Sequence, residues 1–223
     1  MQPLEIASLA AGTASVLCLG AHCDDIEIGC GGTVLRLLEA NPELEVHWVV
    51  LCSDELRRRE AQEGARRFLG VDAEKRVRIQ SFRDGFLPYS GVEVKEFFER
   101  LKGEVQPDLI LTHYRSDLHQ DHRVVCELTW NTFRNHLILE FEIPKYDGDL
   151  GVPNFFVPLS EAQAARKCEH VLAAFPSQRG RSWFSEDTFR ALMRLRGVEC
   201  NAPGGYAEAF HARKVVLEPR RSA

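Results

Sequence analysis

The stretch Ser15-Val-Leu-Cys-Leu-Gly-Ala-His22-Cys-Asp24-Asp25-Ile-Glu-Ile-Gly29-Cys-Gly-Gly-Thr33 decides the fold that we expect for this chain. Its first six residues are apolar or small, which is typical of a strand that is buried on both faces. A loop with ionisable side chains and glycines follows, and then a helical pattern of apolar residues begins. This order of strand, polar loop and helix places the ionisable groups at the carboxyl end of the strand, where open α/β sheets bind their ligands.

A second polar cluster lies about a hundred residues later in the chain. The sequence Asp117-Leu-His119-Gln-Asp121-His122 comes shortly after another apolar run at residues 109–112. Because the carboxyl ends of parallel strands meet at one edge of a sheet, we expect the two clusters to lie together. The sequence therefore predicts one site that is built from both.

The rest of the chain alternates between strand and helix patterns, which predicts a Rossmann-like three-layer α/β sandwich with a mostly parallel sheet. We expect one domain over residues 1–223, with the core in residues 14–136 and a C-terminal part, residues 137–223, that completes the substrate cleft. The expected strands are residues 15–20, 46–52, 77–81, 109–112, 138–143, 154–157 and 212–217. The expected helices are residues 31–40, 55–69, 93–105, 122–136, 161–174 and 185–196.

Composition narrows the class of protein. The net charge of −5 and the lack of a long basic run argue against a nucleic-acid partner. No apolar run reaches the length of a membrane span. The seven cysteines match neither a disulfide framework nor paired Cys-x-x-Cys zinc motifs, and Cys18, Cys52 and Cys126 lie in apolar runs and are expected to be core residues. A cytoplasmic protein is the expectation, with its oligomeric state left open.

The two clusters together carry the ligands of a hydrolytic metal site. Zinc binds His nitrogen and Asp oxygen, and a catalytic zinc keeps one position open for water. His22 and Asp25 share one short loop, and His122 completes the set from the second cluster. We expect Zn²⁺ at these three ligands, although Fe²⁺, Co²⁺ or Mn²⁺ also suit a His/Asp site.

The remaining polar residues of the clusters suit the other steps of a hydrolysis. Asp24 is the expected general base and later the proton donor to the leaving group. His119, if protonated, would stabilise the oxyanion of a tetrahedral intermediate. Asp121 is expected to orient His119 and to favour its charged form.

Simpler explanations exist for these features taken one at a time. An isolated His or Asp at a strand end is usually a loop residue or a helix cap. The glycines at residues 29–32 are able to cradle a phosphate, but they fit neither Gly-x-Gly-x-x-Gly nor a Walker motif. A tight turn with close helix packing explains them better. Two clusters with the same residue types at two strand ends favour the metal site.

Both clusters resemble the PIG-L/LmbE family of zinc-dependent N-deacetylases. The likeness covers Ala21-His-Cys-Asp-Asp-x-Glu-x-Gly-Cys-Gly-Gly-Thr33 and His119-Gln-Asp-His122. It extends to Arg57-x-x-Glu60, to residues 107–113 and to Tyr206-Ala-Glu-Ala-Phe210. This resemblance implies the same roles for the residues named above, and it adds Arg57 and Asp84 as sugar-binding residues.

The resemblance also implies a substrate and shows where this chain departs from the family. It implies hydrolysis of the N-acetyl group of a GlcNAc-like small-molecule sugar or glycoconjugate. The family usually has Pro where Cys23 and Gln120 stand here, and neither position bears a ligand. Cys23 is expected to point away from the metal, and no role is assigned to Cys30.

Two other functions stay open on the sequence alone. One is a metal-dependent hydrolase of another amide or acyl substrate. The other is a non-catalytic sugar- or nucleotide-binding module on the same scaffold, which would need no metal and release no acetate. Arg57 as a helix-surface charge and Asp84 as a turn residue are the ordinary alternatives for those two positions.

Overall fold

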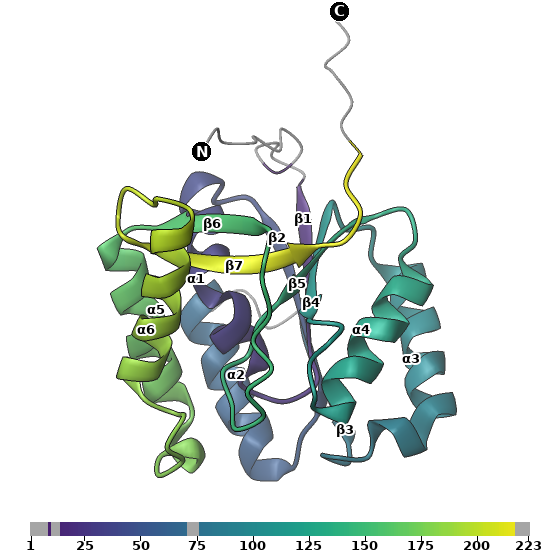
Figure 1. Ribbon diagram of the computed structural model, residues 1–223. Helices are drawn as coiled ribbons and strands as arrows, with labels where there is room; N and C mark the ends of the chain where they lie inside the picture. Colours follow the sequence, from purple (N-terminus) through teal and green to yellow (C-terminus); the bar gives the residue numbers. More distant parts are fainter. Residues whose placement is uncertain (1–8, 10–13, 71–75, 217–223) are drawn as a thin grey trace, which may run out of the picture.

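A computed structural model describes residues 9, 14–70 and 76–216. A single seven-stranded sheet runs through the molecule, in the order β3-β2-β1-β4-β5-β7-β6 (Figure 1). The strands are β1 (Ser15–Gly20), β2 (Glu45–Cys52), β3 (Val77–Phe82), β4 (Leu109–His113), β5 (Leu137–Phe141), β6 (Phe155–Leu159) and β7 (Tyr206–Ala212). The pairs among β1 to β5 are parallel, and β7 pairs antiparallel with both β5 and β6. The predicted mostly parallel α/β fold is confirmed.

Helices cover both faces of the sheet and make the expected three layers. In Figure 1, α1, α2, α5 and α6 lie on the left of the sheet, and α3 and α4 lie on the right. Each layer of helices closes its own apolar core against the sheet, one around Trp48 and Phe141 and the other around Phe98 and Phe133. The helices are α1 (Asp25–Ala40), α2 (Glu55–Leu69), α3 (Gly91–Glu104), α4 (Gln120–Thr132), α5 (Glu161–Ala174) and α6 (Glu186–Glu199), with short 3₁₀ turns η3 (Leu87–Ser90) and η4 (Pro176–Gln178).

Helix α1 begins six residues earlier than predicted. It starts at Asp25, directly after the polar loop, and the glycines expected to form a turn lie inside the helix. Their lack of side chains lets neighbours approach: a Cβ on Gly29 would lie 2.3 Å from Cδ2 of Phe141, and one on Gly31 would lie 2.5 Å from Cε1 of Phe68. Close packing, not a turn, therefore explains these glycines.

The last strand was also placed wrongly. The sequence predicted residues 212–217, whereas β7 spans Tyr206–Ala212 and Leu217 lies outside the described residues. β7 uses the Tyr-Ala-Glu-Ala-Phe segment and fills the gap between β5 and β6. Consequently the C-terminal part belongs to the same sheet as the N-terminal part.

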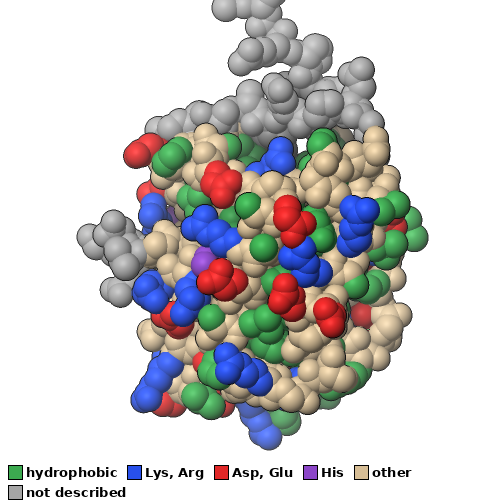
Figure 2. All heavy atoms as spheres, turned by 90° about the vertical axis from the view of Figure 1, so that its left-hand side faces the viewer, with side chains coloured by type: hydrophobic (Ala, Val, Ile, Leu, Met, Phe, Trp, Pro, Cys, Tyr) green, Lys and Arg blue, Asp and Glu red, His purple; other side chains and the backbone are tan. Residues whose placement is uncertain are grey.

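The surface on the side of α5 and α6 carries a mixture of acidic and basic side chains. Figure 2 looks onto that side and shows acidic and basic side chains interspersed over it. Within residues 9, 14–70 and 76–216, none of the helices combines the length and the apolar character that crossing a membrane requires.

Candidate metal centre

The two polar clusters meet between β1 and β4, where the order in which the chain adds strands to the sheet reverses. β1 and β4 are neighbours, although the chain visits β2 and β3 between them. The loop after β1 carries His22, Asp24 and Asp25, and the segment after β4 carries His119 and His122. This junction is the topological switch point at which open α/β sheets bind their ligands.

The three predicted metal ligands converge. Nδ1 of His22 lies 3.1 Å from Nε2 of His122 and 3.4 Å from Oδ2 of Asp25. Nε2 of His122 lies 3.5 Å from Oδ1 of Asp25. Tetrahedral zinc with ligands about 2.0–2.2 Å away holds its donor atoms at about such separations. The predicted grouping of these residues therefore corresponds to a compact N/N/O donor set.

Charges around this donor set favour a cation. Burial lowers the pKa of His22, but the charge of Asp25 and the hydrogen bond to Asp121 outweigh burial and raise it well above the ordinary value. Burial lowers the pKa of His122 to about 4, which leaves its nitrogen unprotonated at neutral pH. Burial raises the pKa of Asp25, yet the neighbouring histidines outweigh it and hold the pKa well below the ordinary value.

His113, the last residue of β4, joins the same cluster and was not predicted. Its Nε2 lies 3.1 Å from Oδ2 of Asp25 and 2.9 Å from the backbone nitrogen of Ala21. Its ring stacks on His122 with 3.9 Å between the ring centroids. The backbone nitrogen of Ala21 donates to Nε2 of His113, and the ligand atoms of Asp25, His113 and His122 all lie within 4.8 Å of one another, so His113 adds a further nitrogen to the donor set.

Asp24 and its neighbour Asp25 point into different surroundings. Oδ1 of Asp24 accepts a 2.7 Å hydrogen bond from Nη2 of Arg57, which lies in the first turn of α2. Burial raises the pKa of Asp24 in spite of this arginine, and Asp25 adds to the rise. Arg57 is thus an inward-facing residue whose side chain is 19% exposed, not a solvated helix-surface charge.

Asp121 orients His22 rather than His119, contrary to the expectation from sequence. Its Oδ2 lies 3.2 Å from Nε2 of His22, and its carboxylate accepts backbone hydrogen bonds from Gly85 and Leu87. Only the backbone nitrogen of Asp121 contacts His119, donating to Nδ1 at 3.3 Å.

The hydrogen bond from the backbone of Asp121 decides which ring nitrogen of His119 is able to donate. With Nδ1 accepting, the ring proton sits on Nε2. Burial and the charge of His22 lower the pKa of His119, which disfavours the protonated form considered above. A neutral Nε2–H remains a hydrogen-bond donor, so this ring is able to donate to a neighbouring group without carrying a positive charge.

A buried acid supports His122 from the side away from Asp25. Oδ2 of Asp117 lies 2.9 Å from Nδ1 of His122 and 2.9 Å from Nζ of Lys145. Burial raises the pKa of Asp117, but His122, His113 and Lys145 outweigh it and hold the pKa well below the ordinary value. Lys145 also bonds Asp149, so the segment between β5 and β6 is tied to this donor set.

Asp84 and Cys52 lie on the far side of the His22 ring. Oδ1 of Asp84 is 3.2 Å from Nε2 of His22, and its side chain is 70% exposed. The thiol of Cys52 faces Oδ2 of Asp121 at 3.9 Å, although the sequence indicated only a core residue. Cys23 turns its thiol away, to the carbonyl of Cys52 at 3.3 Å, and Cys30 bonds the carbonyl of Ile26.

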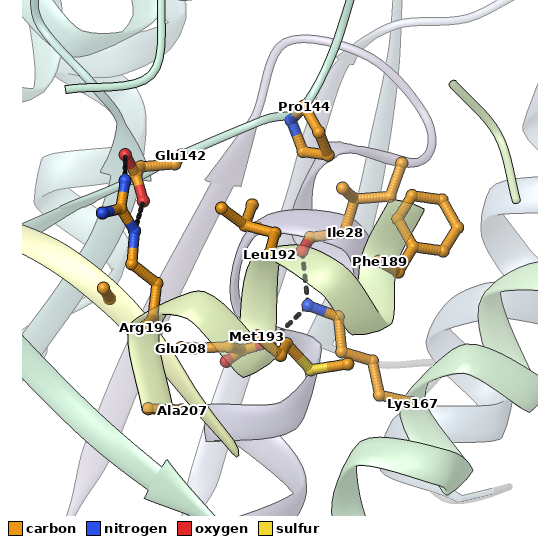
Figure 3. Close-up of a pocket in the computed structure, with 12 residues that line it drawn as sticks. Ile28, Glu142, Pro144, Lys167, Phe189, Leu192, Met193, Arg196, Ala207 and Glu208 are labelled. Carbon is orange, nitrogen blue, oxygen red and sulfur yellow. Dashed lines mark hydrogen bonds and ion pairs between the residues drawn. The ribbon is translucent and has the colours of Figure 1, made fainter. Parts of the chain in front are cut away.

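A second buried network fixes helix α1 behind the centre (Figure 3). Glu208 of β7 accepts hydrogen bonds from the backbone nitrogens of Gly32 and Thr33, in the middle of α1. Nζ of Lys167 donates to Glu208 and to the carbonyl of Ile28, which in a regular helix would accept from Gly32. Since α1 starts at Asp25, this network positions the loop that carries His22 and Asp24.

Comparison with family profiles decides the family. The profile described as GlcNAc-PI de-N-acetylase, PIG-L, matches residues 17–133, more than half of the chain. This chain belongs to the PIG-L family. The match spans both polar clusters and ends just after α4. The resemblance drawn from the motifs is confirmed.

Solved structures agree with this assignment. N,N'-diacetylchitobiose deacetylase from Pyrococcus horikoshii is 25% identical, with a TM-score of 0.67, and the match covers 88% of this chain and 82% of that one. A deacetylase of the teicoplanin biosynthetic pathway is 18% identical, with a TM-score of 0.67 and coverages of 88% and 96%. GalB, the 4-carboxy-2-hydroxymuconate hydratase of Pseudomonas putida KT2440, is 18% identical, with a TM-score of 0.73 and coverages of 94% and 100%. The last two likenesses show the fold alone.

Proposed function

We propose that this protein is a metal-dependent N-deacetylase that removes the N-acetyl group from an N-acetylated amino sugar or its conjugate. Membership of the PIG-L family and the likeness to a diacetylchitobiose deacetylase support the reaction. The observation that carries the proposal is the different surroundings of two adjacent carboxyl groups: Asp24 accepts a hydrogen bond from Arg57, whereas Asp25 lies within 3.5 Å of ring nitrogens of His22, His113 and His122. Such a pair divides the work between a proton carrier and a metal ligand.

The donor set fits a divalent ion, and zinc is the proposed one. His22, Asp25 and His122 would hold it, with Asp117 and Asp121 fixing the imidazole rings from behind. When bound, zinc supplies a Lewis acid that polarises the acetamide carbonyl and promotes attack by water at neutral pH.

Asp24 carries the proton through the reaction. Its carboxylate accepts a proton as water attacks and later gives it to the departing amine, which completes the release of acetate and a free amino sugar. The raised pKa suits both roles because it brings the group nearer to the working pH. The Nε2–H of His119 donates to the developing oxyanion.

Two polar residues at the rim are the proposed partners of the sugar hydroxyls. Arg57 reaches Asp24 from α2, and Asp84 reaches His22 from the loop after β3. Asp84 is 70% exposed and Arg57 is 19% exposed next to the donor set, so hydroxyl groups beside the acetamide would meet Asp84 first and the guanidinium of Arg57 behind it. The choice of sugar is proposed to lie with these two residues and with the segment between β5 and β6.

Acetate release is the test. Purified protein that carries one equivalent of zinc is incubated with GlcNAc, UDP-GlcNAc and a GlcNAc conjugate, with O-acetyl sugars as controls and a chelator as the negative control. The proposal predicts chelator-sensitive acetate release from an N-acetyl sugar. Release from O-acetyl or non-sugar amides alone would make the protein a different acyl hydrolase. Tight sugar binding without metal or acetate release would make it a binding module.

A further inference from the structure

His22 presents its two ring nitrogens to two different groups of ligands. Nδ1 faces Asp25 and His122, the donor set described above. Nε2 faces the other way, 3.2 Å from Oδ1 of Asp84 and 3.2 Å from Oδ2 of Asp121. The imidazole ring therefore stands between two sets of metal-binding atoms.

The second set contains a thiol. Sγ of Cys52, at the end of β2, lies 3.9 Å from Oδ2 of Asp121. The ligand atoms of His22, Cys52 and Asp121 all lie within 4.8 Å of one another. The Cys52–Asp121 separation of 3.9 Å is longer than the 3.1–3.5 Å separations of the first donor set, as expected where one donor is sulfur, whose bonds to zinc are longer than those of nitrogen and oxygen. Asp84 lies at the solvent side of this second set, because its side chain is 70% exposed and contacts Nε2 of His22.

We propose that His22, Cys52, Asp84 and Asp121 form a second cation site, selective for thiophilic divalent ions, which shares His22 with the first centre. Sulfur, imidazole and carboxylate together suit zinc, cobalt and cadmium, whereas magnesium, calcium and manganese prefer oxygen ligands. Binding releases the thiol proton of Cys52 and the Nε2 proton of His22 to solvent. The second site is therefore the weaker one and fills after the first.

Occupation of this site has a consequence for the proposed reaction, and this consequence rests on the proposed function. An ion bound there holds Asp84, the proposed partner of the sugar, and removes the hydrogen bond from His22 to Asp121. Substrate then competes with the ion for Asp84. Excess zinc or cadmium inhibits acetate release, and excess magnesium does not.

Spectroscopy with cobalt and cadmium tests the second site independently of turnover. The metal-free protein is titrated with each ion while the thiolate-to-metal charge-transfer band and the bound metal per chain are measured. The wild type is expected to bind two ions and to develop the band. Cys52→Ser is expected to lose the band and the second ion. Cys23→Ser, which removes the neighbouring buried thiol that bonds the Cys52 carbonyl, is the matched control and should keep both.

A band that persists in Cys52→Ser, or a wild type without a band at excess cadmium, would overturn the site. Asp84→Asn supplies a second variant, on an exposed side chain, in case Cys52→Ser fails to fold. It should weaken the second ion about tenfold and leave the first unchanged; an unchanged second affinity would also contradict the site. Acetate release by the one-zinc enzyme is measured in parallel. A Cys52-dependent band without acetate release overturns only the proposed function, and acetate release without a band overturns only the second site.

Discussion

Nδ1 of His22 lies 3.1 Å from Nε2 of His122, although a hundred positions separate the two residues in the chain. The strand order explains the meeting, because β1 and β4 are neighbours and both point their carboxyl ends at the same edge. Two imidazoles held this closely beside a buried carboxylate form a site that favours a cation.

The affinity for zinc should fall as the pH is lowered. Metal binding needs the unprotonated nitrogen of His22, and the pKa of His22 is raised well above its ordinary value. Below that pKa protons compete, so affinity should drop by about tenfold per pH unit for each proton displaced. Chelator competition between pH 6 and pH 9 measures this. An affinity that is flat over the range would contradict the assignment of His22.

Asp117→Asn should weaken metal binding about 10- to 100-fold. The acid accepts from Nδ1 of His122 at 2.9 Å and so fixes which nitrogen faces the ion. Asp149→Asn is the control, because Asp149 bonds Lys145 and the backbone nitrogen of Leu118 but neither the carboxylate of Asp117 nor the ring of His122. Equal zinc affinities for Asp117→Asn and the wild type would show that His122 is not oriented by this acid.

Gly29→Ala should destabilise the fold by about 1–3 kcal/mol or more, since the new methyl group would lie 2.3 Å from the ring of Phe141. Gly103→Ala is the matched control in helix α3, where nothing lies within 4 Å of the new carbon. That control should gain up to about 1 kcal/mol from helix propensity. Urea unfolding of both variants measures the difference, and equal midpoints would refute the packing explanation of Gly29.

The gain in stability of Glu27→Gln over the wild type should increase as the pH rises. Burial raises the pKa of Glu27 well above its ordinary value, and both carboxyl oxygens lack hydrogen-bond partners. The unfolded chain ionises this group above about pH 4.3 while the folded chain keeps it neutral, so the wild type loses stability with rising pH. Glutamine cannot ionise and avoids this loss. Tm of both proteins at pH 5 and pH 8 tests the point, and a pH-independent difference would contradict it.

Sequence patterns predicted the sheet and the ligand clusters because both are local signals. The apolar runs at β1 and β4 and the polar residues that follow them lie within a few positions of each other. The patterns misplaced the start of α1 because glycines 29, 31 and 32 are weak helix formers, and only the approach of Phe141 and Phe68 shows why glycine stands at positions 29 and 31 inside a helix.

The residues that sequence reasoning missed are those whose role depends on distant neighbours. His113 ends an apolar strand, and nothing local distinguishes it from a core residue until Asp25 and His122 are placed beside it. Cys52 also ends an apolar run, and its position against Asp121 follows from the parallel pairing of the strands. The same holds for Asp121, whose side chain turns to His22 across the site although His119 is closer in sequence.

The most direct test of the proposed function compares wild type with Asp24→Asn at one zinc per chain. Bound zinc and acetate release from the best N-acetyl sugar are measured on the same samples. We expect Asp24→Asn to keep its zinc, because Asp24 bonds Arg57 rather than the histidines, and to lose about 10²- to 10⁴-fold in kcat. Full turnover by Asp24→Asn with zinc bound would contradict the assigned proton carrier and the mechanism built on it.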